Sequence, residues 1–482
     1  MITLQDLIKI SDEIYEIPKS FRADMLVPAR LFANEAIIKD ILQDKSLEQL
    51  VNVTTLPGIQ KYAMAMPDIH QGYGFPIGGV AAMAIDEGGV ISPGGIGYDI
   101  NCGVRLLVSD LTHKEIKEKL PELATALFKA IPSGVGKGGK LEFKGEDLEK
   151  ILQFGAKRLV ELNYGNEQDL ELCEENGCMK FADPAKVSSR AKNRGSDQLG
   201  TLGSGNHFLE VQKVDKIFDE KVATAFGLHE NLVTIMIHCG SRGLGHQNCT
   251  DYVRLMLPKL KEWKIILPDR ELACAPFNSN EGQDYFVSMA ASANFAWANR
   301  HLIAHNARKA WKKFLGENSN LNLVYDVAHN IGKKELHKIN GKEKEVIMHR
   351  KGATRAFPAN HPEIPQKYKS VGQPVFIPGT MGTSSYVLVG TQAGMDISFG
   401  SSCHGAGRKL SRMQAKKDIH GTKLKAELEK QGIIIRTFSD YSLAEEAPQA
   451  YKDVEEVINV MHNSGIAKKV ARLIPLAVIK GD

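Results

Sequence analysis

Five segments of this chain place metal-binding side chains where an apolar run meets a turn of small or polar residues. Four of them, LGSGNHFLE, NLVTIMIHCGSRG, LNLVYDVAHN and MDISFGSSCHGAGR, carry His207, His238, His329 and His404. The fifth, GGIGYDINCGVRLLV, carries Asp99 and Cys102. Carboxylate, thiolate and imidazole donors together suit borderline divalent ions such as Zn, Mn, Fe or Co, whereas calcium takes oxygen ligands. These donors exceed the needs of one ion, so the pattern predicts a two-metal site with one histidine to spare.

Strands must deliver these donors, because strand ends hold side chains with little positional freedom. Asp99 and Cys102 are three residues apart in one turn, so both can face one ion. A single thiolate can bridge two ions, which makes Cys102 the expected shared ligand, with open positions left for substrate oxygens. Any one histidine at a strand end is equally well explained as a buried structural side chain. Five converging segments favour metal binding for the set.

The rest of the chain predicts an α/β fold, with central β-sheets flanked by helices and the active site at strand ends. Apolar spacing predicts helices within 1–60, where Leu4, Leu7, Ile8 and Ile10 fit a helical repeat, and over 113–130, 145–162, 282–315 and 444–474. Strands are expected in GGVAAMAI and around 231–240, 321–329, 345–358, 373–377 and 385–400. The donors span 99 to 404 without a low-complexity linker. We therefore expect a single domain over 1–482, with a helical N-terminal portion (1–60) and a catalytic core (60–482).

Bulk composition narrows the functional class. Hydrophobic residues make up 43% and charged residues 24% of the 482, as in folded globular proteins, and the net charge of +4 permits a nucleic-acid partner without requiring one. The start of the chain lacks the pattern of a signal peptide, and no apolar run approaches the ~20 residues that span a bilayer. The 7 scattered cysteines fit a reducing compartment. We expect a cytoplasmic protein with no membrane partner.

Several further segments carry weaker signals. Glycine-rich loops at 133–139, 201–207 and 378–385 can cradle phosphate through backbone N–H groups, although none matches the Walker A pattern. In HGAGR, Arg408 can neutralise a phosphate that the His404 imidazole attacks. The basic run 333–355 is expected either to contact a polyanion or to be a solvated face. His337 and His349, within this run, are expected to be solvated, and His301 and His305 to be structural or to line a pocket.

The longer motifs resemble those of one family. PDIHQGYGFPIGG, GGIGYDINCGVRLL, LGSGNHFLE, HCGSRGLG, YDVAHN, HRKGATRAF, PGTMGTSSY and SCHGAGR together resemble the RtcB-type RNA ligases, from about residue 60 to Lys480. The resemblance implies a ligase that depends on GTP and Mn²⁺. It would join an RNA end with a 3′-phosphate or 2′,3′-cyclic phosphate to a 5′-hydroxyl end, through a guanylylated histidine and an RNA-3′-pp-5′-G intermediate, in tRNA splicing or RNA repair.

The same resemblance assigns roles to individual residues. Asp99, Cys102 and His207 would hold one Mn²⁺, and Cys102, His238 and His329 the other, while His404 would be the nucleophile that becomes guanylylated. The guanosine nucleotide would contact Asn206, His207, Phe208, Leu209, Glu210, His329, Asn330, Pro378, Gly379, Thr380, Met381, Ser385, His404, Gly405, Ala406, Gly407, Tyr451 and Lys480. The partners would be RNA ends, such as tRNA halves or broken RNA. The resemblance leaves open whether an activator of the archease family is needed.

Two other functions compete with ligation. A two-metal phosphohydrolase acting on RNA or nucleotides would use the same donors, with His404 as a further ligand or general acid. A non-catalytic RNA-binding protein with a structural metal would not need His404 at all. Covalent labelling of His404 by GTP distinguishes a ligase from both alternatives, because neither alternative forms a nucleotide adduct.

Overall fold

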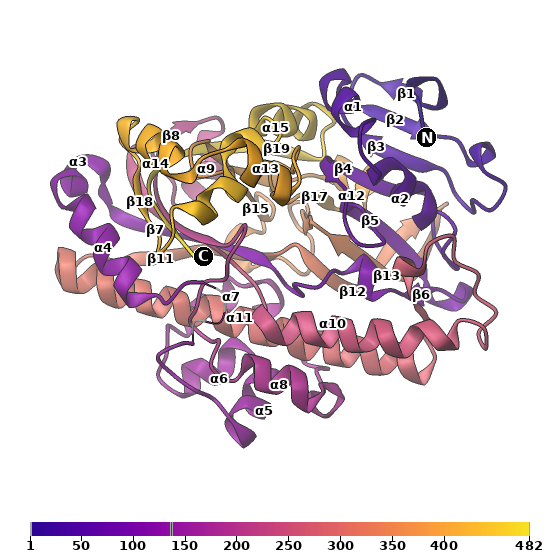
Figure 1. The fold of residues 1–482 in the computed structure, drawn as a ribbon, viewed down its shortest axis with the longest axis horizontal. Coiled ribbons are helices and arrows are strands. Elements are labelled where there is room, and N and C mark those ends of the chain that lie inside the picture. The colour runs from indigo at the N-terminus through magenta and orange to yellow at the C-terminus, as the bar shows by residue number, and fades with distance from the viewer. Residues whose placement is uncertain (1, 135, 137, 482) are drawn as a thin grey trace.

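The structure is a computed structural model that describes residues 2–134, 136 and 138–481. Two large β-sheets and flanking helices organise these residues, which confirms the predicted α/β class (Figure 1). One sheet has seven strands in the order β1-β2-β3-β4-β5-β13-β12. The other has eight, of which seven follow the order β11-β7-β9-β8-β19-β16-β15 and the eighth, β18, pairs with β19. Within the described residues, no helix is both long and apolar enough to cross a membrane.

The eight-stranded sheet brings most of the predicted donors to one edge. Its strands are β7 (Gly103–Thr112), β8 (Phe208–Ile217), β9 (Leu232–Cys239), β11 (Leu321–Ala328), β15 (Pro374–Ile377), β16 (Ser385–Gly390), β18 (Ile434–Arg436) and β19 (Ala467–Lys480). β7 and β8 each pair antiparallel with β9, and β11 pairs antiparallel with β7, so Gly103 lies opposite both Cys239 and Ala328. The start of β7, the end of β9 and the end of β11 therefore meet.

The seven-stranded sheet meets the eight-stranded sheet close to these strand ends. Its strands are β1 (Ile8–Ser11), β2 (Ile14–Ile17), β3 (Ala29–Phe32), β4 (Ala63–His70), β5 (Ile77–Ala84), β12 (Asn330–Ile339) and β13 (Lys342–Lys351). β12 begins directly after His329, so the two sheets share one crossing point. Two small sheets pair β6 (Val90–Ile91) with β10 (Ala275–Pro276) and β14 (Ala353–Arg355) with β17 (Ser401–Cys403). β17 ends immediately before His404.

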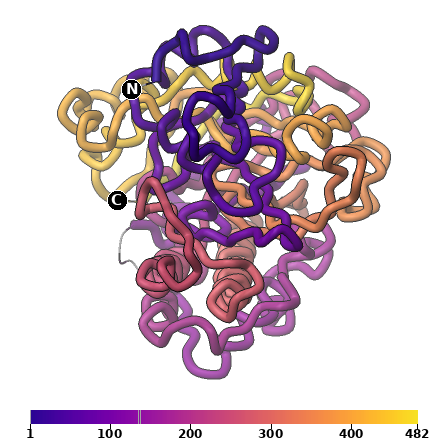
Figure 2. Tube along the Cα trace, turned by 90° about the vertical axis from the view of Figure 1, so that its right-hand side faces the viewer, coloured from indigo at the N-terminus to yellow at the C-terminus, as the bar shows by residue number. Residues whose placement is uncertain are grey.

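Helices cover the sheets on the outside. The longest, α11 (Asn280–Leu315), begins where the Ser279 hydroxyl accepts a hydrogen bond from the Gly282 N–H, and it runs beneath both sheets beside α10 (Arg242–Met256) (Figure 1). Figure 2 shows these two helices nearly end-on, next to each other. The others are α1 (Glu35–Ile41), α2 (Ser46–Val53), α3 (His113–Ile116), α4 (Leu120–Ala130), α5 (Gly145–Phe154), α6 (Ala156–Glu161), α7 (Gln168–Glu171), α8 (Ser189–Gly195), α9 (Glu220–Phe226), α12 (Gln392–Ser398), α13 (Arg412–Asp418), α14 (Gly421–Lys430) and α15 (Val454–Asn463).

The prediction of a helical N-terminal portion is wrong for its first half. Residues 8–11, 14–17 and 29–32 form strands β1 to β3, and only α1 and α2 are helices. The spacing of Leu4, Leu7, Ile8 and Ile10 fits a helix, but the following residues alternate in burial, with Tyr15 and Ile17 buried. Because β3 pairs parallel with β4, this segment extends the edge of the sheet. Tertiary pairing therefore outweighs the local apolar spacing.

Two predictions near the C-terminus also need correction. Of 444–474, only α15 (454–463) is an α-helix; the chain turns at Gly465, whose φ is +79°, and then forms β19 between β8 and β16. A short apolar run such as LIPLAVIK suits a buried strand as well as a helix. It forms a strand here because it pairs with β8 on one side and β16 on the other. Within 385–400, residues 392–398 form α12, which Thr391 caps by accepting a hydrogen bond from the Gly394 N–H at 3.0 Å. The other predicted helices and strands are found close to their expected positions.

Candidate active site and metal centre

The five predicted metal ligands converge at the meeting point of the strand ends. The Cys102 Sγ lies 3.4 Å from Nε2 of His207 and 3.3 Å from Nε2 of His238. The His207 Nε2 is 2.8 Å from Oδ2 of Asp99, and the His238 Nε2 is 3.2 Å from Nε2 of His329. Two three-donor groups result, each with its donor atoms within 4.8 Å of one another: Asp99, Cys102 and His207, and Cys102, His238 and His329. Cys102 is common to both.

The donor set fits divalent metal ions in spacing and chemistry. Donors about 2.0–2.3 Å from one tetrahedral ion stand roughly 3.3–3.7 Å apart, which matches the separations around the Cys102 sulfur. Burial lowers the pKa of His238 and His329 well below the usual range, so both imidazoles are neutral and keep lone pairs for a metal. Burial raises the pKa of the Cys102 thiol to about 12. A metal ion would displace that thiol proton.

The donor group of Asp99, Cys102 and His207 favours a positive charge. Burial opposes a charged imidazole at His207, but Cys239, Cys102 and Asp99 outweigh it and raise the pKa of His207 well above its usual value. Burial would likewise raise the pKa of Asp99, yet the His207 charge lowers it to about 2. In the absence of a metal, the proton on His207 balances the negative charge of Asp99. A bound cation would replace that proton.

Backbone contacts fix the ligand-bearing turns. The Asp99 Oδ1 accepts a hydrogen bond from the Ser241 N–H at 2.9 Å, and the Cys102 carbonyl accepts one from the His329 N–H at 2.9 Å. Beneath them the buried Arg300 guanidinium donates from Nη1 to the carbonyls of Asn101, at 2.7 Å, and Cys239, at 2.9 Å. Arg300 thus ties together the residues that adjoin Cys102 and His238.

His404 lies beside the donors, and a carboxylate orients it. Its Nδ1 lies 2.5 Å from Oδ2 of Asp68, and its backbone N–H donates to the same oxygen at 3.0 Å. Its ring centroid is 4.9 Å from that of His329. With Nδ1 held by Asp68, Nε2 is the ring nitrogen left for chemistry. His404 reaches this position because β17 pairs with β14, which follows β13 of the seven-stranded sheet.

One cavity opens over the donors and over His404. Of the predicted nucleotide contacts, its lining includes Asn206, Phe208, His329, Asn330, Pro378, Gly379, Thr380, Met381, His404, Gly405, Ala406, Gly407, Tyr451 and Lys480. Asp99, Cys102 and His238 line it as well. The structure therefore gathers segments from Asp99 to Lys480, 381 residues apart in sequence, around one space.

Four predicted nucleotide contacts lie outside this lining. His207 belongs to the metal-donor groups, and Leu209 packs in the hydrophobic core, because alternation along β8 turns it away from the face that carries Phe208. Glu210 is buried on the same strand face as Phe208, and its Oε2 accepts a hydrogen bond from Gln212 at 2.8 Å. The Ser385 hydroxyl accepts the Gly379 N–H at 3.1 Å and so holds the 378–381 loop.

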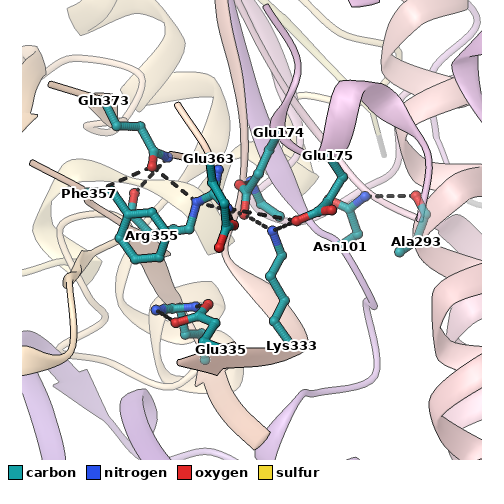
Figure 3. Close-up of polar contacts among 12 residues, drawn as sticks. Asn101, Glu174, Glu175, Ala293, Lys333, Glu335, Arg355, Phe357, Glu363 and Gln373 are labelled. Atoms are coloured by element: carbon teal, nitrogen blue, oxygen red, sulfur yellow. Dashed lines mark hydrogen bonds and ion pairs between the residues drawn. The ribbon is translucent and has the colours of Figure 1, made fainter. Parts of the chain in front are cut away.

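The basic run 333–355 is divided between core and surface: Lys333, Arg350, Lys351 and Arg355 are buried, whereas Lys334, Lys338 and Lys342 are exposed. Lys333 donates to Glu174 at 2.5 Å and to Glu175 at 2.7 Å, and Arg355 pairs with Glu363 at 2.7 Å (Figure 3). Arg350 forms a buried two-bond pair with Glu335. Their neighbours His337 and His349 are buried rather than solvated. The partners of Lys333 come from a segment about 158 residues away, whereas Glu335 and Glu363 lie within or just after the run.

Other earlier expectations have mixed outcomes. His301 is buried, with ring contacts to the Tyr164 carbonyl and to Arg105, as expected for a structural side chain. Arg408 lines the cavity but is paired with Glu446 at 3.2 Å. Of the 133–139 loop, residues 135 and 137 lie outside the described residues. Cavity residues without a prediction are His70, Ile77, Gly352, Arg412 and Glu446. Asp68 was not predicted either, although it lies in PDIHQG, one of the motifs that carry the family resemblance.

A carboxylate-held histidine and two groups of metal-binding donors at one cavity define the protein as an α/β enzyme. The family described as "tRNA-splicing ligase RtcB" matches residues 49–481. The chain is 54% identical over 476 residues to the tRNA-splicing ligase RtcB of Archaeoglobus fulgidus, with 98% of each chain covered. It is 53% identical to that of Thermococcus kodakarensis, over 100% of this chain and 99% of the relative.

A shorter relative shows the same likeness. The RNA-splicing ligase RtcB of Mycobacterium tuberculosis is 52% identical over 435 residues, which cover 90% of this chain and 100% of the relative. The chain therefore belongs to the RtcB family, and it is a ligase. The resemblance drawn from the sequence motifs is confirmed.

Proposed function

We propose that this enzyme joins RNA ends that carry a 3′-phosphate or a 2′,3′-cyclic phosphate to ends that carry a 5′-hydroxyl, using GTP and two Mn²⁺ ions. The observation that carries the proposal is the pair Asp68–His404 next to the twin donor groups, at the lining of one cavity. The names of its relatives, tRNA-splicing and RNA-splicing ligases, supply the substrate class.

The two donor groups would hold the metal ions. Asp99, Cys102 and His207 would bind one ion, and Cys102, His238 and His329 the other. When bound, such ions neutralise phosphate charge and stabilise the charge that develops during phosphoryl transfer. The chain contributes the shared sulfur, two neutral imidazoles and the hydrogen bonds that fix the ligand turns.

His404 would act as the nucleophile. Asp68 accepts the Nδ1–H, so the lone pair of Nε2 is free to attack the α-phosphorus of GTP. A P–N bond forms and the bond to pyrophosphate breaks, which leaves guanylylated His404. Water would first add to the phosphorus of a 2′,3′-cyclic end and break its bond to the 2′-oxygen, which leaves a 3′-phosphate. An oxygen of the RNA 3′-phosphate then attacks the phosphorus held by His404 and releases the imidazole. The 5′-hydroxyl oxygen finally attacks the activated RNA phosphorus and expels GMP.

The remaining side chains would bind the nucleotide. Guanine presents N1–H and N2–H donors, and the buried Glu210 has one carboxylate oxygen, Oε1, without a hydrogen-bond partner among the described residues. Lys480, at the end of β19, and the Phe208 ring line the cavity on the same side of the sheet. Tyr451 and Arg408 stack, with the guanidinium 4.9 Å from the ring centroid, at the lining of the same cavity. These groups support a site for a base and its phosphates.

Covalent labelling tests the proposal. Purified enzyme with Mn²⁺ and α-³²P-labelled GTP is expected to take up an acid-labile label that peptide mapping places on His404. His404→Ala should abolish both labelling and ligation, whereas His229→Ala, at an exposed histidine between α9 and β9, should retain both. If wild-type enzyme ligates RNA without ever taking the label, or releases phosphate without GTP, the proposal fails in favour of another mechanism.

A further inference from the structure

Three aromatic rings form a cluster beside the metal-donor groups that the proposed mechanism does not use. Tyr73 lies in the loop between β4 and β5, Tyr98 in the turn before β7, and His246 in the second turn of α10. The Tyr73 and Tyr98 ring centroids are 5.2 Å apart at an interplanar angle of 74°. The Tyr98 and His246 centroids are 4.8 Å apart at 33°. We refer to these three residues as the aromatic platform.

The platform is accessible. His246 is exposed, and Tyr73 and Tyr98 are half-buried. Tyr98 rests partly on the hydrophobic core around α11, so its position is fixed from below. Within the described residues the His246 ring takes part in no hydrogen bond or ion pair. The Tyr98 ring is held by the core, and the exposed His246 imidazole packs on it. The outer face of His246 is therefore available to a ligand.

Its position links it to the reacting centre. Tyr98 directly precedes Asp99, and the Ser241 N–H that binds the Asp99 carboxylate opens the turn into α10, which carries His246. Arg194, which is exposed, donates from Nη1 to Gln247, the residue after His246 in α10, at 3.1 Å. An exposed guanidinium beside an aromatic face is the combination that single-stranded nucleic acid contacts through phosphate and base. Of the nearby carboxylates, Asp99 accepts the Ser241 N–H at 2.9 Å and Glu271 accepts the Gly74 N–H at 2.9 Å.

We propose that the aromatic platform is a subsite that stacks the nucleobase of the terminal nucleotide of an RNA end. The inference rests on the proposed function, because it needs a terminal phosphate or hydroxyl at the donor groups next to Asp99. Stacking accepts any base, since every base has a π-face. That tolerance suits an enzyme that recognises ends by their phosphate and hydroxyl groups.

A thermodynamic cycle tests the subsite. Ligation is measured for wild type and His246→Ala with three substrate pairs: intact ends, an abasic residue at the 3′-phosphate end, and an abasic residue at the 5′-hydroxyl end. We expect His246→Ala and one of the two abasic substitutions each to raise the KM for that strand about tenfold, with the two changes together no worse than either alone. The abasic strand that shows this coupling identifies the RNA end that the platform binds.

Controls separate stacking from structural effects. His246→Phe should restore the KM, because a phenyl ring keeps the π-face, and His229→Ala should not change it. Labelling by GTP alone should be unaffected in His246→Ala. Additive effects of His246→Ala with both abasic substrates, or an unchanged KM for His246→Ala, would overturn the subsite. Failure of the wild-type enzyme to take the GTP label would instead count against the proposed function, so the two failures are distinguishable.

Discussion

One oxygen of Asp68 receives two hydrogen-bonding groups of His404, the ring Nδ1 at 2.5 Å and the backbone N–H at 3.0 Å. Both the tautomer and the orientation of the imidazole therefore depend on a single carboxylate atom. Gly407 makes this approach feasible: a Cβ there would stand 2.3 Å from the Asp68 carbonyl oxygen, and its φ is +76°. The HGAGR turn therefore packs directly against the PDIHQG segment.

Asp68→Asn is expected to slow the labelling of His404 by GTP on the order of 10²–10⁴-fold. The amide can donate but no longer favours the tautomer with Nε2 unprotonated, so the nucleophilic nitrogen is lost in most molecules. The rate of label uptake in a single turnover measures this directly. Asp86→Asn, at an exposed aspartate, is the control, and a normal labelling rate in Asp68→Asn would contradict the assigned role.

Cys102→Ser should weaken metal binding at both positions at once, because the sulfur belongs to both donor groups. Titration with Co²⁺ is the measurement: wild type is expected to show a thiolate-to-metal absorption band that the variant lacks, with affinity reduced at least tenfold. Cys178→Ser, at a half-buried cysteine outside the donor groups, should leave the titration unchanged. Loss of only one of two bound ions in Cys102→Ser would show that the sulfur is not shared.

The candidate site could be predicted from sequence further than the fold could. Its donors stand where apolar runs meet turns, and the strands β9 and β11 were predicted, whereas β7 was not among the expected strands. The resemblance to a known family added the expected nucleotide contacts, most of which line the cavity. Alternation along β8 explains why Leu209 does not join the others.

Other features depend on partners that are distant in sequence. The strand β19 cannot be distinguished from a helix until its place between β8 and β16 is known. Lys333 reads as a surface cation until Glu174, 159 residues away, is brought against it. The role of Asp68 could not be predicted for the same reason, because its partner His404 lies 336 residues away in the sequence. Local patterns identify chemistry, whereas burial and charge pairing are set by the tertiary fold.

The affinity for guanosine should rise with pH up to about 8. Burial raises the pKa of Glu210 to about 8, so its carboxyl group is mostly protonated at neutral pH when the site is empty. Guanine N1–H and N2–H donors need the carboxylate form, so binding must expel the proton, and affinity should increase up to tenfold per pH unit below 8 and then level off. Calorimetric titration of guanosine across pH 6–9 measures this. Glu210→Gln should bind weakly with no such slope; an equal slope in the variant would assign it to another group.

The stability of the nucleotide-free enzyme should show the opposite dependence for the same group. A carboxyl whose pKa is higher in the folded protein than in the unfolded chain favours folding at low pH, so its contribution falls as pH rises through about 4.5 to 8. The difference in unfolding free energy between wild type and Glu210→Gln, followed by denaturant titration, should therefore shift in favour of the variant as pH increases. A difference independent of pH would contradict the raised pKa.

Arg300 should link stability to metal affinity. Its guanidinium is fully buried, pairs with Asp326 at 2.7 Å and holds the carbonyls of Asn101 and Cys239, which adjoin two metal-binding side chains. Arg300→Met should lower the unfolding free energy by about 3 kcal/mol, because it removes one of the two buried guanidinium partners of Asp326, the other being Arg105, and leaves the two carbonyls without their donor. It should also weaken Co²⁺ binding about 10–100-fold by releasing the ligand turns.

Arg308→Met provides the matched comparison on the same helix. Arg308 also forms a two-bond pair, with Asp169, but it contacts neither ligand turn. Its loss should lower the melting temperature while leaving the Co²⁺ affinity unchanged. Arg300→Lys keeps the charge but not the planar fork, so it should recover part of the stability and little of the metal affinity. If Arg300→Met and Arg308→Met weaken Co²⁺ binding equally, the effect reflects general destabilisation and Arg300 has no specific hold on the metal centre.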